Sequence, residues 1–262
     1  MQRFFQSKFD FPICLDVPYK FCDFRAAYGE VFAEYLAGYD FWGHCDIDLL
    51  WGDIRAFVTD EVLTKYDRVY THGHCCLYKN TACVNSWYRT LPANGYQEWK
   101  TVFSKLDACY FDKWGEHSGG GMSAIIQSNG IPYYDEPDMA DLRPPNAHPF
   151  RHNGYFSSYT QADIKDKGLY FHYKEGKLFA CYNNTTRECL YCHFQKRPIK
   201  IEEGYNPNDF YLLSPGRITS RSAAAKRDRA GELVLFANSF VRRVKRGVRR
   251  ILKQLLLHRK PN

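Results

Sequence analysis

Two aspartates separated by one residue, Asp46 and Asp48, are the side chains of this sequence best suited to chemistry. They follow a short aromatic segment, residues 39–45, which is expected to form a β-strand. Residues i and i+2 of a strand share a face, and two carboxylates on one face repel each other unless a cation lies between them. Mg²⁺ and Mn²⁺ prefer such oxygen ligands. The pair therefore predicts a divalent metal at a strand end, which would bridge phosphates and stabilise a departing diphosphate.

Two other interpretations of the aspartate pair stay open. In the plainer one, both carboxylates are solvated in a turn, although the apolar residues 49–51 that follow them do not favour an idle surface pair. In the other, Asp46 is the nucleophile of a haloacid-dehalogenase-type phosphatase, a class that also carries two aspartates at a strand end. The aromatic strand before Asp46 and the leucine at position 50 argue against that class.

The segments around the pair alternate between helical and strand patterns. Expected helices are residues 22–36, 54–66 and 122–128, with further helical pieces in 84–106, and expected strands are residues 39–45, 68–71 and 131–134. This alternation predicts an α/β layered fold.

The second half of the sequence is richer in strand patterns. Expected strands are residues 169–174, 177–182 and 188–192, joined by the hairpin turns Glu175-Gly176 and Asn183-Asn184. A glycine-rich loop is expected at residues 113–121, an irregular acid- and proline-rich loop at 135–149, and a linker at 214–231.

The formal net charge is +7, and much of the excess lies in the last 46 residues. Residues 232–258 carry an apolar stripe at helical spacing, flanked by arginines and lysines. This pattern predicts a basic amphipathic helix that binds an anionic membrane surface. The alternative is a helix docked on the body with its cations in water. Nucleic acid is disfavoured as a partner because no recognised nucleic-acid motif accompanies the charge.

The ten cysteines are interpreted as reduced thiols. The first ten residues have no apolar signal-peptide core, and no run of eighteen apolar residues occurs, so a cytoplasmic protein at the inner face of the plasma membrane is expected. Residues 189–193 match a haem c attachment pattern, and residues 72–76 contain two histidines and two cysteines. Haem attachment is disfavoured because it needs export, and zinc because the spacing fits no standard finger.

Four short blocks together resemble a known family: residues 20–25 (Lys-Phe-Cys-Asp-Phe-Arg), 27–29, 41–48 (Phe-Trp-Gly-His-Cys-Asp-Ile-Asp) and 52–54. They resemble a bacterial family found with capsular and other surface-polysaccharide genes, whose members look like glycosyltransferases of the GT-A fold. The resemblance runs from about residue 9 to about residue 197. It implies a mixed sheet flanked by helices. Relatives begin with a strand-helix-strand unit of about thirty residues, for which residues 1–20 are too short, so an N-terminally truncated form is expected.

The resemblance also implies roles for particular residues. Asp46 and Asp48 would hold Mn²⁺ or Mg²⁺ and the donor diphosphate, and His193 resembles the late histidine that completes the metal site. Asp23 and Arg25 resemble residues beside the donor sugar and ribose, although Asp23 also suits a helix cap. Either Lys196 or Arg197 would contact the diphosphate.

Residues 115–121 lie where the family has an acceptor-side loop. Glu116 or Asp112 would act as the general base of an inverting reaction. The expected organisation is a GT-A-like domain at residues 1–213, a linker at 214–231 and the basic helix at 232–262. The expected function is sugar transfer from a nucleotide-sugar donor to a surface-glycan or lipid-linked acceptor. The alternative is a non-catalytic partner in a polysaccharide-synthesis complex.

Overall fold

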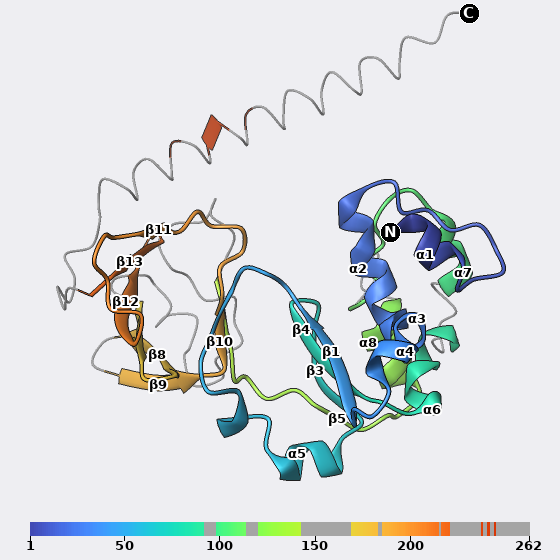
Figure 1. Cartoon of the computed structure of the whole chain (residues 1–262), viewed down its shortest axis with the longest axis horizontal. Coiled ribbons are helices and arrows are strands. Elements are labelled where there is room, and N and C mark those ends of the chain that lie inside the picture. Colours follow the sequence, from blue (N-terminus) through green and yellow to red (C-terminus); the bar gives the residue numbers. More distant parts are fainter. Residues whose placement is uncertain are drawn as a thin grey trace, which may run out of the picture. The chain divides into compact units, whose positions relative to one another are not determined.

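The computed structural model describes residues 1–91, 98–113, 120–142, 169–182, 185–214 and 216–220, together with Ala237, Phe240, Val241 and Val244. The chain divides into two compact units (Figure 1). Unit 1 comprises Met1–Ile47 and Val58–Glu136, and unit 2 comprises Asp48–Phe57 and Pro137–Asn262. Helices and mixed sheets occur together, which confirms the predicted α/β class.

Unit 1 contains a four-stranded sheet in the order β1-β4-β3-β5. The strands are β1 (Phe41–Cys45), β4 (Cys75–Lys79), β3 (Arg68–His72) and β5 (Tyr133–Tyr134). Strand β4 is antiparallel to both β1 and β3, and β5 runs parallel to β3. The strands predicted at residues 39–45 and 68–71 are thus confirmed, and the one at 131–134 is shorter than expected.

Helices cover one face of this sheet (Figure 1). The helical segments of unit 1 are α1 (Gln2–Gln6), η1 (Pro18–Lys20), α2 (Phe21–Phe24), η2 (Arg25–Ala27), α3 (Tyr28–Val31), α4 (Ala33–Leu36), α5 (Asp60–Lys65), α6 (Ala82–Asn85), η4 (Trp87–Arg89), α7 (Trp99–Ser104) and α8 (Gly121–Ser128). Stacked aromatic pairs form the core between the layers. Trp42 and Tyr78 of the sheet stack with ring centroids 4.6 Å apart, and Phe24 and Phe103 of the helices at 4.2 Å. Such pairs stabilise a core beyond their area burial alone.

The single helix predicted at residues 22–36 is wrong, because the chain there forms four short turns, α2, η2, α3 and α4. The backbone leaves the α region at Ala27 (φ −97°, ψ 1°) and at Phe32 (φ −107°, ψ 20°). Gly29 lets this irregular helical segment pack closely against Asn85 and Trp42. A Cβ atom at this position would lie 2.4 Å from Asn85 Oδ1 and 2.7 Å from Trp42 Nε1, so only glycine permits this close approach.

The described part of unit 2 is mostly β-structure. A three-stranded sheet has the order β2 (Leu49–Trp51), β10 (Tyr191–His193), β6 (Ala140–Asp141). A six-stranded sheet has the order β11 (Lys200–Ile201), β13 (Arg217–Thr219), β12 (Asp209–Leu213), β7 (Tyr170–Lys174), β8 (Lys177–Tyr182), β9 (Thr185–Cys189). The predicted turn at Glu175 and Gly176 is confirmed, with positive φ at both residues. Residues 217–219, expected in a linker, instead form β13, and η3 (Ile54–Ala56) is a short helical turn at the start of this unit.

The strand predicted at residues 188–192 is divided between the two sheets of unit 2. β9 ends at Cys189 in the six-stranded sheet, and β10 begins at Tyr191 in the three-stranded sheet. Leu190, between them, donates its N–H to Asp138 O and accepts from Gly52 N. The change of sheet at this residue carries His193 to the register position opposite Asp141 of β6.

A buried ion pair fixes the first turns of unit 1. Lys20 Nζ lies 2.8 Å from Asp23 Oδ2, and both side chains have no exposed surface. The Asp23 carboxylate also accepts hydrogen bonds from the backbone N–H groups of Cys109 and Phe111. Lys20 donates to the carbonyl oxygens of Val102 and Asp107. The pair therefore ties α2 to the chain around residues 102–111.

We expect Asp23→Ala to lower the free energy of unfolding by about 3–5 kcal/mol, because it leaves the Lys20 ammonium buried without its counter-charge. The matched control is Glu34→Ala, which removes a surface ion pair with Lys8 and whose side chain is 81% exposed. That change is expected to cost less than about 1 kcal/mol. Urea unfolding followed by tryptophan fluorescence measures both, and equal losses would contradict the role assigned to Asp23.

Candidate functional site

The two aspartates of the Asp-Ile-Asp motif belong to different units. The sequence predicted that Asp46 and Asp48 share one face of a strand, and this is wrong. β1 ends at Cys45 and β2 begins at Leu49, so both aspartates lie in the connection between the two strands. Ile47 between them is fully exposed, and the division between the units falls directly after it. Each aspartate therefore has its own set of neighbours.

Asp46 is bound by an arginine in unit 1. Arg25 Nη2 lies 2.5 Å from Asp46 Oδ1, and Arg25 Nη1 lies 3.2 Å from Asp112 Oδ2. The Nη1 group also donates to the carbonyl oxygen of Gly73. Charge-assisted bonds of this kind are stronger than neutral ones. The guanidinium of Arg25 thus lies between two carboxylates and offsets the repulsion between them.

Asp112 is the most perturbed acid of this cluster. Its side chain is 2% exposed, and its Oδ1 atom is buried without a hydrogen-bond partner among the described residues. Burial raises the pKa of Asp112 to about 6, and the nearby charges of Arg25 and Lys113 oppose that rise. A carboxyl group with a pKa near 6 suits proton transfer at neutral pH.

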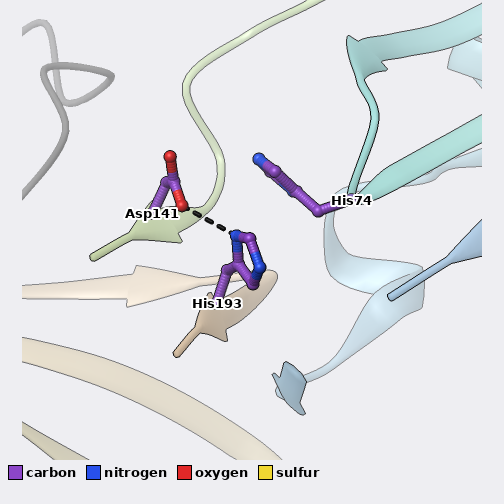
Figure 2. A group of neighbouring side chains, drawn as sticks. All are labelled: His74, Asp141 and His193. Atoms are coloured by element: carbon purple, nitrogen blue, oxygen red, sulfur yellow. Dashed lines mark hydrogen bonds and ion pairs between the residues drawn. The ribbon is translucent and has the colours of Figure 1, made fainter. Parts of the chain in front are cut away.

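In unit 2 a histidine is held between two carboxylates. His193 Nδ1 lies 2.8 Å from Asp141 Oδ1, and Figure 2 shows this edge of the ring turned to that carboxylate. The other ring nitrogen, Nε2, lies 3.4 Å from Asp48 Oδ1. The pairing of β10 with β6 on one side and with β2 on the other positions the three residues.

The turn after β10 encloses the same carboxylates. Gln195 and Lys196 both have positive φ, 53° and 61°, which non-glycine residues rarely adopt. In this conformation the Lys196 N–H donates to Asp48 Oδ2 at 2.7 Å, and Gln195 Nε2 donates to Asp141 Oδ1 at 2.9 Å. The Phe194 N–H donates to the backbone oxygen of Asp48. The strained turn therefore fixes both acids while His193 Nε2 keeps facing Asp48 Oδ1.

The geometry of Asp48 and His193 fits a divalent metal. Metal–nitrogen and metal–oxygen bonds of about 2.1 Å place two neighbouring ligand atoms about 3.0–3.4 Å apart in octahedral or tetrahedral coordination. The distance of 3.4 Å between Nε2 and Oδ1 falls in this range. A metal-binding histidine also usually donates its other N–H to a carboxylate, as His193 does with Asp141.

The other predicted site residues fall into three groups. Asp23 is a buried structural residue without a free oxygen, and it does not cap a helix, so the expected donor contact is wrong. Lys196 is exposed, whereas Arg197 is buried, and that burial lowers the pKa of Arg197 to about 10. Glu116 and most of residues 232–258 lie outside the described residues.

Asp141 is the member of the candidate site that the sequence analysis missed. It lies in the segment 135–149, which was expected to be an irregular loop, and a two-residue strand gives little periodicity to detect. Cys189 and Cys192, considered for haem attachment, have no exposed surface and so offer no accessible thiol. No helix in the described ranges is long and apolar enough to cross a membrane.

Fold and site together define a mixed α/β protein with a histidine–carboxylate centre. The chain belongs to a family of unknown function (DUF6625), whose model matches residues 1–222. No curated protein and no solved structure matches the chain. The family assignment therefore covers unit 1 and unit 2 as far as residue 222, without supplying an activity.

Asp112 should give unit 1 a measurable pH dependence. Its pKa of about 6 in the folded protein exceeds the ordinary value of 3.8, so the folded state holds this proton more tightly than the unfolded state does. Stability is therefore lost as the pH rises from about 4 to about 6, by up to roughly 3 kcal/mol. In Asp112→Asn this loss is absent. We expect the unfolding free energy of the wild type minus that of the variant to fall across this pH range.

Urea unfolding of both proteins at a series of pH values gives that difference directly. A constant offset between the two proteins would reflect only the changed hydrogen bond to Arg25. Parallel curves from pH 4 to 7 would therefore contradict the raised pKa.

Proposed function

We propose that this protein is a metal-dependent glycosyltransferase with a GT-A-like fold. It transfers a sugar from a nucleotide-sugar donor to a surface-polysaccharide or lipid-linked acceptor. The observation that carries the proposal is the distance of 3.4 Å between Asp48 Oδ1 and His193 Nε2, with Asp141 behind the histidine. The resemblance of the sequence to capsule-associated transferases supports it, because the aspartate motif and the late histidine are the residues which that family uses for metal.

Asp48 and His193 hold the metal in this proposal. Mn²⁺ or Mg²⁺, when bound, supplies the charge that neutralises a departing diphosphate. Asp141 orients the His193 ring and fixes the N–H on Nδ1, so that Nε2 offers its lone pair. The Lys196 N–H engages one oxygen of Asp48 and leaves the other facing His193. Asp46, two residues earlier in the chain, is the third ligand predicted from the sequence.

Three cationic side chains bind the donor in this proposal. Lys196 extends from the turn that holds Asp48 and is exposed, so its ammonium suits a phosphate oxygen. Arg25 and Arg197 are the other predicted donor residues, and both are largely enclosed. Asp112 is the proposed general base, with Glu116 as its alternative, because a pKa of about 6 leaves Asp112 mostly ionised near neutral pH.

A non-catalytic partner in a polysaccharide-synthesis complex is the second candidate. The observation that favours it is the ion pair between Arg25 and Asp46, because this pair neutralises Asp46 without any metal. The same ion pair weighs against a haloacid-dehalogenase-type phosphatase, which needs Asp46 as a free nucleophile. Binding of metal and nucleotide separates these candidates.

Calorimetric titration of Mn²⁺, alone and with a panel of nucleoside diphosphates, tests the metal site. We expect the wild type to bind nucleotide only in the presence of Mn²⁺. The double variant Asp46→Ala/Asp48→Ala should lose both Mn²⁺ binding and nucleotide binding. His193→Ala removes a ligand and should abolish measurable Mn²⁺ binding. Asp141→Asn should weaken Mn²⁺ affinity about 10–100-fold, because it disturbs only the orientation of the ring.

The matched control is His172→Ala. His172 also pairs with a carboxylate in unit 2, since its Nε2 lies 2.7 Å from Asp209 Oδ1. Its loss should leave Mn²⁺ affinity unchanged. If the wild type binds no nucleotide in the presence of Mn²⁺, this chain is not a competent transferase and the non-catalytic candidate takes its place.

We also propose that residues 232–258 hold the protein on an anionic membrane surface, where lipid-linked acceptors reside. Three apolar residues of this segment, Phe240, Val241 and Val244, are exposed. We expect the full chain to float with vesicles that contain phosphatidylglycerol but not with phosphatidylcholine alone. Phe240→Asp/Val244→Asp should abolish flotation. The control Ile201→Asp changes an exposed apolar residue elsewhere and should float normally. Equal flotation after removal of residues 232–262 would refute the membrane role.

A further inference from the structure

Two cysteines lie opposite each other at the end of the β1–β4 pair. The antiparallel register aligns Cys45, the last residue of β1, with Cys75, the first residue of β4. All ten cysteines of the chain lie in its described part, and the structure has each of them as a free thiol. Among the strand pairings, this register sets two of these thiols directly across from each other.

The backbone hydrogen bonds show which kind of antiparallel pair this is. Asp46 N donates to His74 O at one end of the ladder, and Asn80 N donates to Asp40 O at the other. Hydrogen-bonded and non-hydrogen-bonded pairs alternate along an antiparallel ladder. Cys45 and Cys75 therefore form a non-hydrogen-bonded pair. In such pairs the Cα atoms lie about 4.5 Å apart, which is inside the range of about 4.4–6.8 Å that a disulfide spans.

The neighbouring thiol cannot take the place of Cys75. Successive side chains of a strand point to opposite faces of the sheet. Cys76 faces the helix-covered core and contacts the His72 oxygen through its thiol. Cys75 points to the other face, as Cys45 does. Cys45 is exposed, so a reagent in solution reaches it first, and Cys75 lies buried beside it.

We propose that Cys45 and Cys75 are a redox-modification site that closes reversibly into a cross-strand disulfide. The oxidant class is a small-molecule disulfide such as glutathione disulfide. The Cys45 thiolate attacks one sulfur of the oxidant, whose S–S bond breaks and releases one glutathione thiolate. The Cys75 thiolate then attacks the Cys45 sulfur of the mixed disulfide and releases the second. Two cysteines are oxidised, one glutathione disulfide becomes two glutathiones, and the two protons pass to these through solvent.

Closure has a direct structural consequence for the candidate site. Cys45 immediately precedes Asp46, the aspartate that Arg25 binds. A bond from Cys45 to β4 ties down the chain two residues before it leaves unit 1 at Ile47. The disulfide therefore restricts the freedom of the Asp-Ile-Asp connection, whatever ligand that connection serves.

The test uses the full chain, folded, in buffers with graded ratios of glutathione to glutathione disulfide. Free thiols are then blocked with iodoacetamide and tryptic peptides are analysed by mass spectrometry. We expect a cross-link between the peptide of residues 26–55 and the peptide of residues 69–79, which disappears on addition of dithiothreitol. Cys76→Ala should retain the cross-link, and this identifies Cys75 as the partner.

Two further variants complete the design. In Cys75→Ser, Cys45 should accumulate the mixed disulfide with glutathione, because no second thiol displaces it. Cys83→Ser removes another exposed thiol and should change nothing. The proposal is overturned if the wild type carries only glutathione on Cys45, or if the cross-link reaches Cys76 instead. It is also overturned if the link forms only in urea.

Discussion

One residue, Asp48, connects the elements of unit 2 on which the candidate site depends. Its Oδ2 atom accepts the Lys196 N–H, its backbone oxygen accepts the Phe194 N–H, and its Oδ1 atom faces His193 Nε2. These contacts hold the start of β2 against the turn after β10. That turn contains two consecutive non-glycine residues with positive φ, a conformation that persists only when surrounding contacts stabilise it. These contacts thus maintain a strained turn in which Asp48 is held through Oδ2 while its Oδ1 atom faces His193.

The sequence predicted a site that contains both Asp48 and His193, and the structure brings these two side chains within 3.4 Å of each other, yet the sequence did not identify Asp141. The two aspartates of the motif are only two positions apart, so the sequence alone identifies them as a pair. The contact of Asp141 with His193 depends on the parallel register of β6 with β10, two short strands about fifty residues apart in the chain. Such a register is set by tertiary packing and leaves no periodic pattern in a two-residue strand. Asp23 was misjudged for the related reason that its partners, the N–H groups of Cys109 and Phe111, come from a distant loop.

The same distinction applies to the fold. Strands with a clear local pattern were predicted well, and β8 begins and ends where expected because a Glu-Gly turn precedes it. The helix expected at residues 22–36 failed because its apolar residues pack in several directions around one aromatic core and not along one stripe. The break at Leu190 was missed because a change of sheet needs partners, here Asp138 and Gly52, that local sequence does not reveal. Strands with local turn signals could therefore be predicted from the sequence, whereas contacts between distant segments could not.

The structure also changes the argument for a metal. The sequence-based reason was repulsion between two aspartates on one strand face, but each aspartate has its own neighbours. Arg25 forms an ion pair with Asp46 and another with Asp112. The negative charge of Asp46 therefore does not need a metal ion to offset it. At Asp48 the situation differs, because the distance of 3.4 Å to His193 Nε2 is long for a hydrogen bond and suits two ligands of one ion. The metal proposal thus depends on Asp48 and His193 of unit 2, and Asp46 is open to a new partner only if an incoming ligand draws Arg25 away from it. A phosphate group, which Arg25 can bind with both of its terminal nitrogens, is the kind of ligand that would do so.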